Sequence, residues 1–100
     1  MAALLVERWP VFAVELRDAL LHDGEIDLAG SVKGLTVVSM CSCTDEFCQS
    51  FHTAAPPDGA YGAGHRNLWL GQPWPDGFLI LDVVDDEIRF VEVLYRPPLD

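Results

Sequence analysis

The stretch Phe78-Leu-Ile-Leu-Asp-Val-Val-Asp-Asp-Glu-Ile-Arg-Phe-Val-Glu-Val-Leu-Tyr95 decides the fold of this chain. Two runs rich in β-branched and aromatic residues flank a pair of aspartates, which is the pattern of a β-hairpin. A two-residue turn at Asp85 and Asp86 predicts these opposed pairs: Asp82 with Arg89, Val83 with Ile88, and Leu81 with Phe90. That register leaves Leu79 opposite Glu92, so we also expect a β-bulge near Phe90 and Val91.

An amphipathic helix is predicted near the amino-terminal end. Apolar residues recur there at the spacing of one helical face, at Trp9, Phe12, Ala13, Leu16, Ala19 and Leu20. Pro10 suits the first turn, where no N–H donor is needed, and Gly24 can take the left-handed conformation that ends a helix. Residues 2–8 either extend this helix or form a separate turn.

The rest of the chain holds short β-rich runs separated by turn residues. We expect a short strand or loop at 25–34, strands at 35–43, 48–53 and 66–70, a loop at 54–64 and a turn at 72–77. One helix followed by hairpins, without a second helix to connect parallel strands, predicts the α+β class. We expect a single domain over residues 1–100, with the amino-terminal helix packed on an antiparallel meander sheet of four to five strands.

The charge of the chain is strongly negative. Sixteen Asp and Glu against six Lys and Arg give a formal net charge of −10, and the acids are spread along the sequence. Phosphate backbones are bound by clustered cations, and one lysine with five scattered arginines forms no such cluster, so we expect no nucleic-acid binding. The favoured macromolecular partner is a basic protein, because a negative field speeds encounter with positive surfaces.

Targeting signals and cysteine usage bear on the compartment. The apolar residues 1–6 are followed by Glu7 and Arg8, without the cationic start or cleavage motif of a signal peptide. No run approaches the roughly eighteen apolar residues of a membrane span. Three cysteines, an odd number, fit free thiols in a reducing compartment better than a disulfide scaffold. We therefore expect a cytoplasmic protein without a membrane segment.

The most specific motif is Cys41-x-Cys43-x4-Cys48-x3-His52. If residues 44–47 form a four-residue turn, Cys43 lies opposite Cys48 and Cys41 lies opposite Ser50. The two-residue period of strands then places all three thiols and the His52 imidazole on one face. Three sulfurs and one imidazole are a ligand set for tetrahedral zinc, provided that they converge on one point.

Three interpretations of this motif stay open. The one favoured by residue type is that the cysteines are small apolar residues buried in the core of a reduced protein. The second is a structural zinc site, and the third is a reactive thiol with His52 or His65 as its base. A cross-strand disulfide between Cys43 and Cys48 is geometrically conceivable but disfavoured in a reducing compartment.

The glycine-rich loop at 54–64 is the second candidate site. Loops this long in small domains are often functional, and a functional interpretation makes Tyr61, His65 and Arg66 a recognition cluster beside Asp58. The interpretation that is slightly favoured is a plain connection across the end of the sheet, anchored by Tyr61. The glycines precede a strand rather than a helix, so they do not form a dinucleotide or phosphate motif.

The three tryptophans divide into two groups. Trp9 and Trp69 occupy positions that fit the core, whereas Trp74, which lies between prolines, is expected to be exposed. An exposed tryptophan can mark an interface.

A series of blocks links this chain to other proteins. The blocks are the Cys-Ser-Cys-Thr-Asp-Glu-Phe-Cys-Gln-Ser-Phe-His-Thr run, Pro-Pro-Asp-Gly-Ala-Tyr-Gly, His-Arg-Asn and Leu-Ile-Leu-Asp-Val-Val-Asp. Over residues 41–95 the chain resembles a family of small uncharacterised bacterial proteins with a C-x-C-x4-C-x-S-F block and no assigned function. The resemblance implies a bacterial, cytoplasmic protein and transfers no catalytic residue.

The features together favour a non-enzymatic protein. We expect an acidic interaction protein that binds a basic protein partner, for example a basic toxin domain, as small acidic immunity proteins do. The alternative is a structural or regulatory zinc-binding module on the Cys41/Cys43/Cys48/His52 hairpin, and a third interpretation is a small cysteine-dependent enzyme. The pattern is compatible with a monomer or a homodimer.

Overall fold

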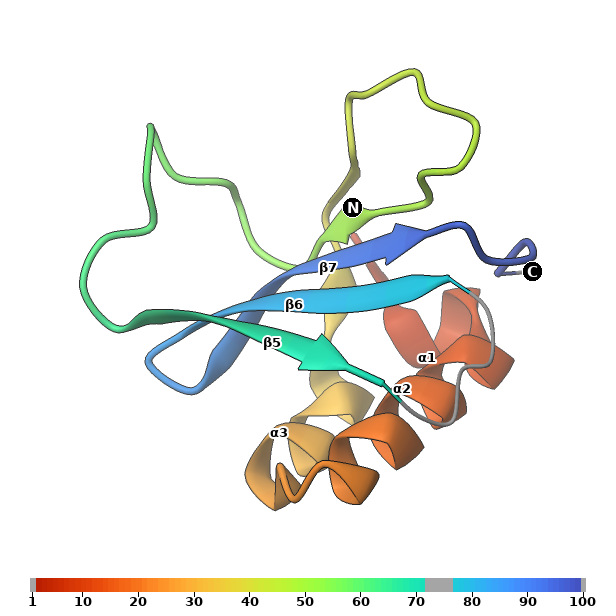
Figure 1. Cartoon of the computed structure of the whole chain (residues 1–100), viewed down its shortest axis with the longest axis horizontal. Helices are drawn as coiled ribbons and strands as arrows, with labels where there is room; N and C mark the ends of the chain where they lie inside the picture. Colours follow the sequence, from red (N-terminus) through yellow and green to blue (C-terminus); the bar gives the residue numbers. More distant parts are fainter. Residues whose placement is uncertain (1, 72–76, 100) are drawn as a thin grey trace.

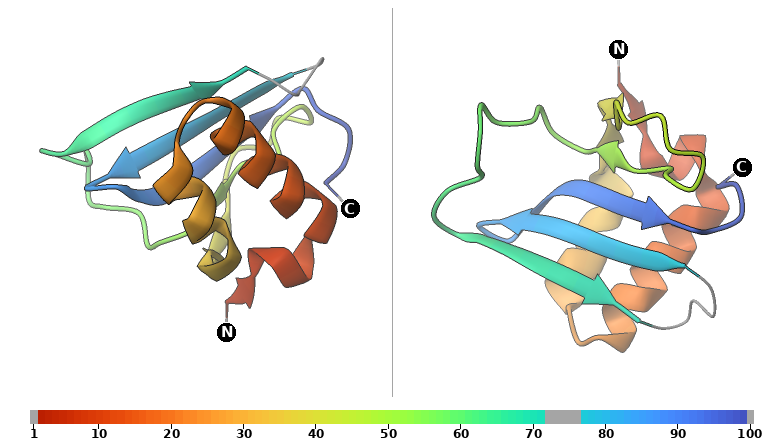
Figure 2. Two further views of the ribbon diagram at one scale, coloured as in Figure 1. Left: turned by 90° about the horizontal axis from the view of Figure 1, so that it is seen from below. Right: turned by 45° about the horizontal axis from the view of Figure 1, so that its top comes forward.

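The protein consists of one layer of helices packed on one face of an antiparallel sheet (Figures 1 and 2). The structure is a computed structural model, and it describes residues 2–71 and 77–99. The elements are β1 (Ala3–Leu4), α1 (Leu5–Arg8), α2 (Pro10–His22), α3 (Ile26–Ser31), the 3-10 turn η1 (Val32–Gly34), β2 (Thr36–Val37), β3 (Ser39–Met40), β4 (Phe51–His52), β5 (His65–Leu70), β6 (Phe78–Val84) and β7 (Glu87–Leu94). The predicted α+β class is confirmed.

The central hairpin of β6 and β7 forms where the sequence predicted it, with one change of register. Val83 lies opposite Ile88, as expected, across a turn in which Asp85 and Asp86 both have positive φ. Two such residues form the type I′ turn whose twist matches that of the strands. The register shifts between Val83 and Asp82, so Asp82 faces Phe90 rather than Arg89. The bulge therefore lies closer to the turn than predicted.

The shift at the bulge corrects the remaining predicted pairs. Leu81 faces Val91 instead of Phe90, and Leu79 faces Val93 instead of Glu92. Because one extra residue exchanges the two faces of a strand, this shift turns the valines of β7 towards the helices.

The order of strands in the five-stranded sheet is β3-β4-β7-β6-β5. Strands β5, β6 and β7 form the expected meander, but β4 pairs with β7 rather than with β5. The long loop at 54–64 thus carries the chain from one side of the sheet to its opposite edge. Strands β1 and β2 form a separate two-stranded ladder.

Helix α2 follows the sequence pattern closely. Pro10 occupies the first helical position, and Gly24 has a φ of 81° just beyond the end of the helix. All six residues predicted for the apolar face are buried: Trp9, Phe12, Ala13, Leu16, Ala19 and Leu20. The four residues of α1 form a separate turn, which settles the alternative left open for residues 2–8.

The prediction of a short strand or loop at 25–34 is wrong, because this segment forms α3 and η1. The alternation of Ile26 and Leu28 suggested a strand, yet Leu28, Ala29 and Val32 are the buried residues. That i, i+1, i+4 spacing is helical. Packing against α2 decides between the two periods, and a second helical segment exists beside α2.

The core lies between the helices and the inner face of the sheet. Phe51 of β4 is fully buried and touches two aromatic rings of the helical layer, Trp9 at 5.2 Å and Phe12 at 6.0 Å between centroids. Leu79, Leu81, Val83, Val91 and Val93 line the same face of the central hairpin. Aromatic and aliphatic burial of this kind is the main stabilising contribution to folding.

The prediction that Trp69 is buried is wrong. Its side chain is 64% exposed, because it lies on the sheet face that the helices do not cover. Its neighbours Leu68 and Leu70 point to the core instead, as strand alternation requires. The predicted turn at 72–77 and the expected exposure of Trp74 fall on residues 72–76, outside the described residues.

No helix of the described residues is both long enough and apolar enough to span a membrane.

The type I′ turn gives a test of the hairpin. Asp86 has a φ of 64°, a region that costs a residue with a Cβ more than it costs glycine. We expect Asp86→Gly to raise the free energy of unfolding by about 1 kcal/mol, measured by urea denaturation. Asp58→Gly removes the same charge from a loop residue without positive φ, and it should give no gain. Equal effects of the two substitutions would contradict the turn assignment.

Candidate metal centre

The cysteine segment begins as a paired strand and then leaves the sheet. Ser39 lies opposite His52, and the Cys41 N–H donates to the Ser50 carbonyl at 2.8 Å. The predicted register, with Cys41 opposite Ser50, is therefore confirmed. Regular pairing ends there, and residues 41–45 form a loop that projects from the sheet (Figure 1).

The returning segment, residues 48–53, is held against β7. Cys48 forms an isolated bridge to Leu94, and the Gln49 N–H donates to the Val93 carbonyl at 2.9 Å. The Val93 N–H in turn donates to the Ser50 hydroxyl at 2.9 Å. A side-chain oxygen thus takes the place of a backbone carbonyl in the ladder. The same Ser50 hydroxyl also contacts the Cys48 thiol, at 3.2 Å.

The loop and the returning segment bring three thiols together. The Sγ atoms of Cys41, Cys43 and Cys48 all lie within 4.8 Å of one another. All three cysteines are free; Cys43 is exposed, and the other two are half-buried. The interpretation that they are small apolar residues of the core is therefore wrong. The end of the paired ladder lies at the surface, and the thiols gather there.

Hydrogen bonds shift the pKa values of Cys43 and Cys48 in opposite directions. Contacts with the Cys48 and Cys41 thiols raise the pKa of the Cys43 thiol to about 11. Burial raises the pKa of Cys48, but hydrogen bonds from the Ser50 hydroxyl and N–H and from the other thiols outweigh it, so the pKa of Cys48 is lowered. In its neutral form the Cys48 thiol donates to the Ser50 hydroxyl at 3.2 Å. Cys48 is therefore the thiol of this pair that ionises more readily.

His52 does not join the thiol cluster. It lies four residues beyond Cys48, about 13 Å along an extended strand. Its ring packs on Phe90 with 4.4 Å between centroids, and its Nδ1 atom is buried without a hydrogen-bond partner. Among the described residues the cluster contains no imidazole or carboxylate as a fourth ligand. The Cys3His set expected from the spacing is reduced to three sulfurs.

Three convergent thiols suit a soft or borderline metal ion. Thiolate is the preferred donor for zinc and copper(I), whereas calcium and magnesium prefer oxygen. With Zn–S bonds of about 2.3 Å, two thiolates of a tetrahedral site lie about 3.8 Å apart. The three Sγ atoms lie within 4.8 Å of one another, so a small movement of the exposed loop would bring them to this spacing.

The loop residues singled out from the sequence divide between two sides of the sheet. Tyr61 stacks on His65 with 4.8 Å between ring centroids, and His65 Nε2 lies 2.7 Å from the Asp82 carboxylate. Asn67 also donates to Asp82, at 2.6 Å. Burial, together with the nearby Asp82 charge, raises the pKa of Tyr61. Asp82 and Asn67 belong to this cluster but were missed, although strand alternation places 65 and 67 on one face.

Arg66 leaves the predicted cluster. It follows His65 in β5 and therefore points to the other face, where its guanidinium contacts Glu25 at 3.0 and 3.2 Å. Hydrogen bonding to Arg66 lowers the pKa of Glu25. Asp58 is exposed in the loop, and it makes no hydrogen bond or ion pair with other residues of the described ranges. The expected four-residue site is thus reduced to the Tyr61–His65 contact.

A row of exposed aromatic rings crosses the sheet next to the cysteine loop. Phe47 stacks on Tyr95 at 4.5 Å, Tyr95 lies 6.2 Å from Phe78, and Phe78 lies 6.3 Å from Trp69. Their exposed fractions run from 39% to 64%. We call these four residues the aromatic row. Tyr95 has a φ of 58°, a backbone conformation that is unfavourable for a bulky residue.

Comparisons with known proteins add no relative: no protein-family model, no curated protein and no solved structure matches this chain.

The Ser50 hydroxyl gives a test of how the segment at 48–53 is held on β7. Ser50→Ala removes the acceptor of the buried Val93 N–H, and we expect it to lower the free energy of unfolding by about 1–3 kcal/mol. Ser39→Ala, at an exposed position of β3, is the matched control and should cost much less. Urea denaturation measures both. If the two variants are equally stable, the hydroxyl does not hold the ladder together.

Proposed function

We propose that this protein binds zinc through Cys41, Cys43 and Cys48. The convergence of the three Sγ atoms within 4.8 Å carries the proposal. Two of these cysteines come from the loop after β3, and the third comes from the segment bonded to β7. A bound ion would join the loop to the sheet at this point.

Three protein ligands leave one position of a tetrahedral zinc ion open. Closed structural sites use four protein ligands, whereas sites with three keep a position for water or another ligand. The exposure of Cys43 supports a site that lies at the surface, where water could fill the fourth position. The core is complete without the site, since none of the three cysteines is buried. Zinc would therefore order the loop rather than drive folding of the domain, unlike the ion of a zinc finger.

Zinc binding can be measured directly. We expect protein purified without chelator to bind one zinc ion per chain, and cobalt(II) substitution to give the intense thiolate charge-transfer absorption of a three-sulfur site. Cys43→Ser should reduce zinc affinity at least tenfold without loss of stability, because Cys43 is exposed. His52→Gln should leave the affinity unchanged, because His52 lies outside the cluster.

Two results would contradict this proposal. One is a zinc content far below one per chain that does not rise on titration with zinc. The other is a binding curve that Cys43→Ser leaves unaltered but His52→Gln weakens. In the first case, binding of copper(I) would show that the site takes copper(I) rather than zinc.

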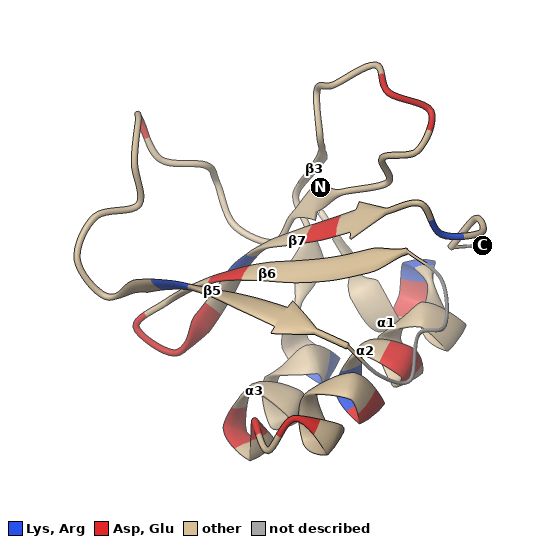
Figure 3. Ribbon diagram, viewed as in Figure 1, with Lys and Arg blue, Asp and Glu red and all other residues tan. Residues whose placement is uncertain are grey.

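A second candidate function is recognition of a basic protein, and the aromatic row supports it. Four exposed aromatic side chains in mutual contact form the kind of anchor that dominates binding energy at interfaces. Asp45 and Glu46 precede Phe47, and Glu92 lies opposite Ile80, two residues along β6 from Phe78. Figure 3 shows acidic residues in the loop that follows β3 and on β7. In a chain of net charge −10, these acids favour a partner with lysine or arginine around an apolar patch.

Substitutions on the row test this second function. We expect the full chain, used as bait in a lysate of the source cells, to retain a basic protein that high salt releases. Trp69→Ser combined with Phe78→Ser should abolish retention, because the two rings supply the apolar contact. Val11→Ser, at an equally exposed position of α2, should have no effect. Retention that survives the double substitution would place the partner elsewhere.

A further inference from the structure

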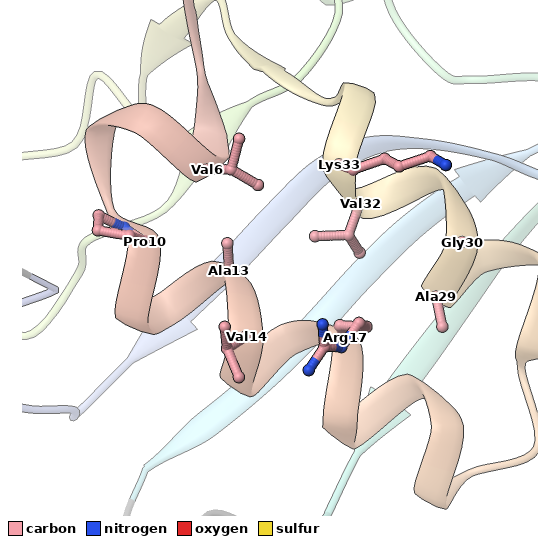
Figure 4. A pocket seen from close by; sticks show the side chains of 9 residues that line it. All are labelled: Val6, Pro10, Ala13, Val14, Arg17, Ala29, Gly30, Val32 and Lys33. Carbon is pink, nitrogen blue, oxygen red and sulfur yellow. The ribbon is translucent and has the colours of Figure 1, made fainter.

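The helical layer carries an apolar groove on the side away from the sheet. The groove has a volume of about 370 Å³ and lies between α1 and α2 on one side and α3 and η1 on the other (Figure 4). Its apolar lining consists of Val6, Pro10, Ala13, Val14, Ala29 and Val32. A groove of this size falls at the lower end of the range for small-molecule sites, roughly 300–1,000 Å³.

Two of the chain's six cationic side chains line this groove. Arg17 comes from α2 and Lys33 from η1, so the cations stand on opposite walls (Figure 4). Arg17 pairs with its neighbour Asp18 at 3.2 Å, and both side chains are half exposed. Lys33 forms no ion pair with any residue of the described ranges. Lys33 is therefore an uncompensated cation at this groove in a strongly acidic chain, whereas Arg17 shares its charge with Asp18.

Gly30 leaves open space in the wall of the groove. Glycine inside a helix is unfavourable, and it is usually retained for a positive φ or a close backbone contact. Gly30 has neither, since its φ is not positive and a Cβ built there meets no atom within 4 Å. It lines the groove, so the missing side chain leaves space there.

We propose that the groove binds a free aliphatic carboxylate, such as a medium-chain fatty acid. Its hydrocarbon chain would lie along the apolar lining, and its carboxylate would lie between Arg17 and Lys33. Burial of methylene groups supplies the affinity, and the two cations select an anionic head group over a neutral or cationic one. This site is separate from the thiol cluster, so the proposal does not rest on zinc binding.

Chain length and head-group charge test the ligand class. Titration of the full chain with decanoate and dodecanoate, below their micelle concentrations, should shift the amide NMR signals of Ala13, Ala29 and Val32 at a single saturable site. Affinity should rise about fourfold for each added methylene. Dodecyltrimethylammonium and dodecanol, which share the tail but lack the carboxylate, should bind at least tenfold more weakly.

Two glycine substitutions separate blocked binding from misfolding. Gly30→Leu fills the groove and should abolish dodecanoate binding, while protein stability is unchanged or higher. Gly34→Leu is the matched control, because Gly34 also has open space around it but does not line the groove. Arg17→Gln combined with Lys33→Gln should weaken dodecanoate at least tenfold and leave dodecanol unaffected.

Several results would overturn the proposal. No saturable shift with dodecanoate at millimolar concentration, or equal binding of the cationic amphiphile, would exclude an anionic ligand. Dodecanoate that binds Gly30→Leu as well as it binds the unsubstituted chain would place the site elsewhere. Association with lipid vesicles without binding of free dodecanoate, or a dimer that Gly30→Leu dissociates, would assign the groove to a membrane or a second copy.

Discussion

Two buried hydroxyl groups hold the segment at residues 48–53 in place, and the rest of the structure depends on that placement. Ser50 and Thr53 are the buried polar residues among those described, and both bond to β7. The Ser50 hydroxyl accepts from the Val93 N–H, and the Thr53 hydroxyl donates to the Ile88 carbonyl at 2.7 Å. Between them Phe51 points into the core, where it meets Trp9 and Phe12. A shifted register would leave these two buried hydroxyl groups without hydrogen-bond partners, which is costly. The bonds therefore favour a single register of this segment on β7.

That register determines where the chemistry of the molecule lies. Phe51 of β4 lies in the core, and β3 pairs with the edge of β4 that faces away from β7. Cys41 and Cys48 therefore lie together where the regular pairing of these strands ends. The loop then returns Cys43 towards them. The thiols therefore converge because the sheet stops there, not because a hairpin aligns them. The His52 ring lies away from the three thiols and packs on Phe90 instead.

The sheet separates two surfaces of different character. Its outer face carries the aromatic row and the contact of Tyr61 with His65, with acidic residues beside them. The opposite side of the molecule is helical, and its groove holds Arg17 and Lys33. A domain with helices on only one face of its sheet leaves such an outer face to solvent or to partners. The two proposed binding surfaces, the aromatic row and the groove, therefore lie on opposite sides of the sheet.

The sequence by itself determined the elements whose pattern is local: helix α2 with its buried face, the β6–β7 hairpin, and the pairing of Cys41 with Ser50. These follow from periodicity and turn chemistry, which neighbouring residues contain in full. Tertiary packing decided the rest. Residues 26–31 form a helix, the β-bulge lies at Arg89, and β4 pairs with β7. Trp69 is exposed, and Arg66 forms an ion pair with Glu25. Tertiary packing also gathered the three sulfurs without His52. Each of these outcomes depends on contacts between residues far apart in the chain, and their energies exceed the small local preferences that a sequence pattern expresses.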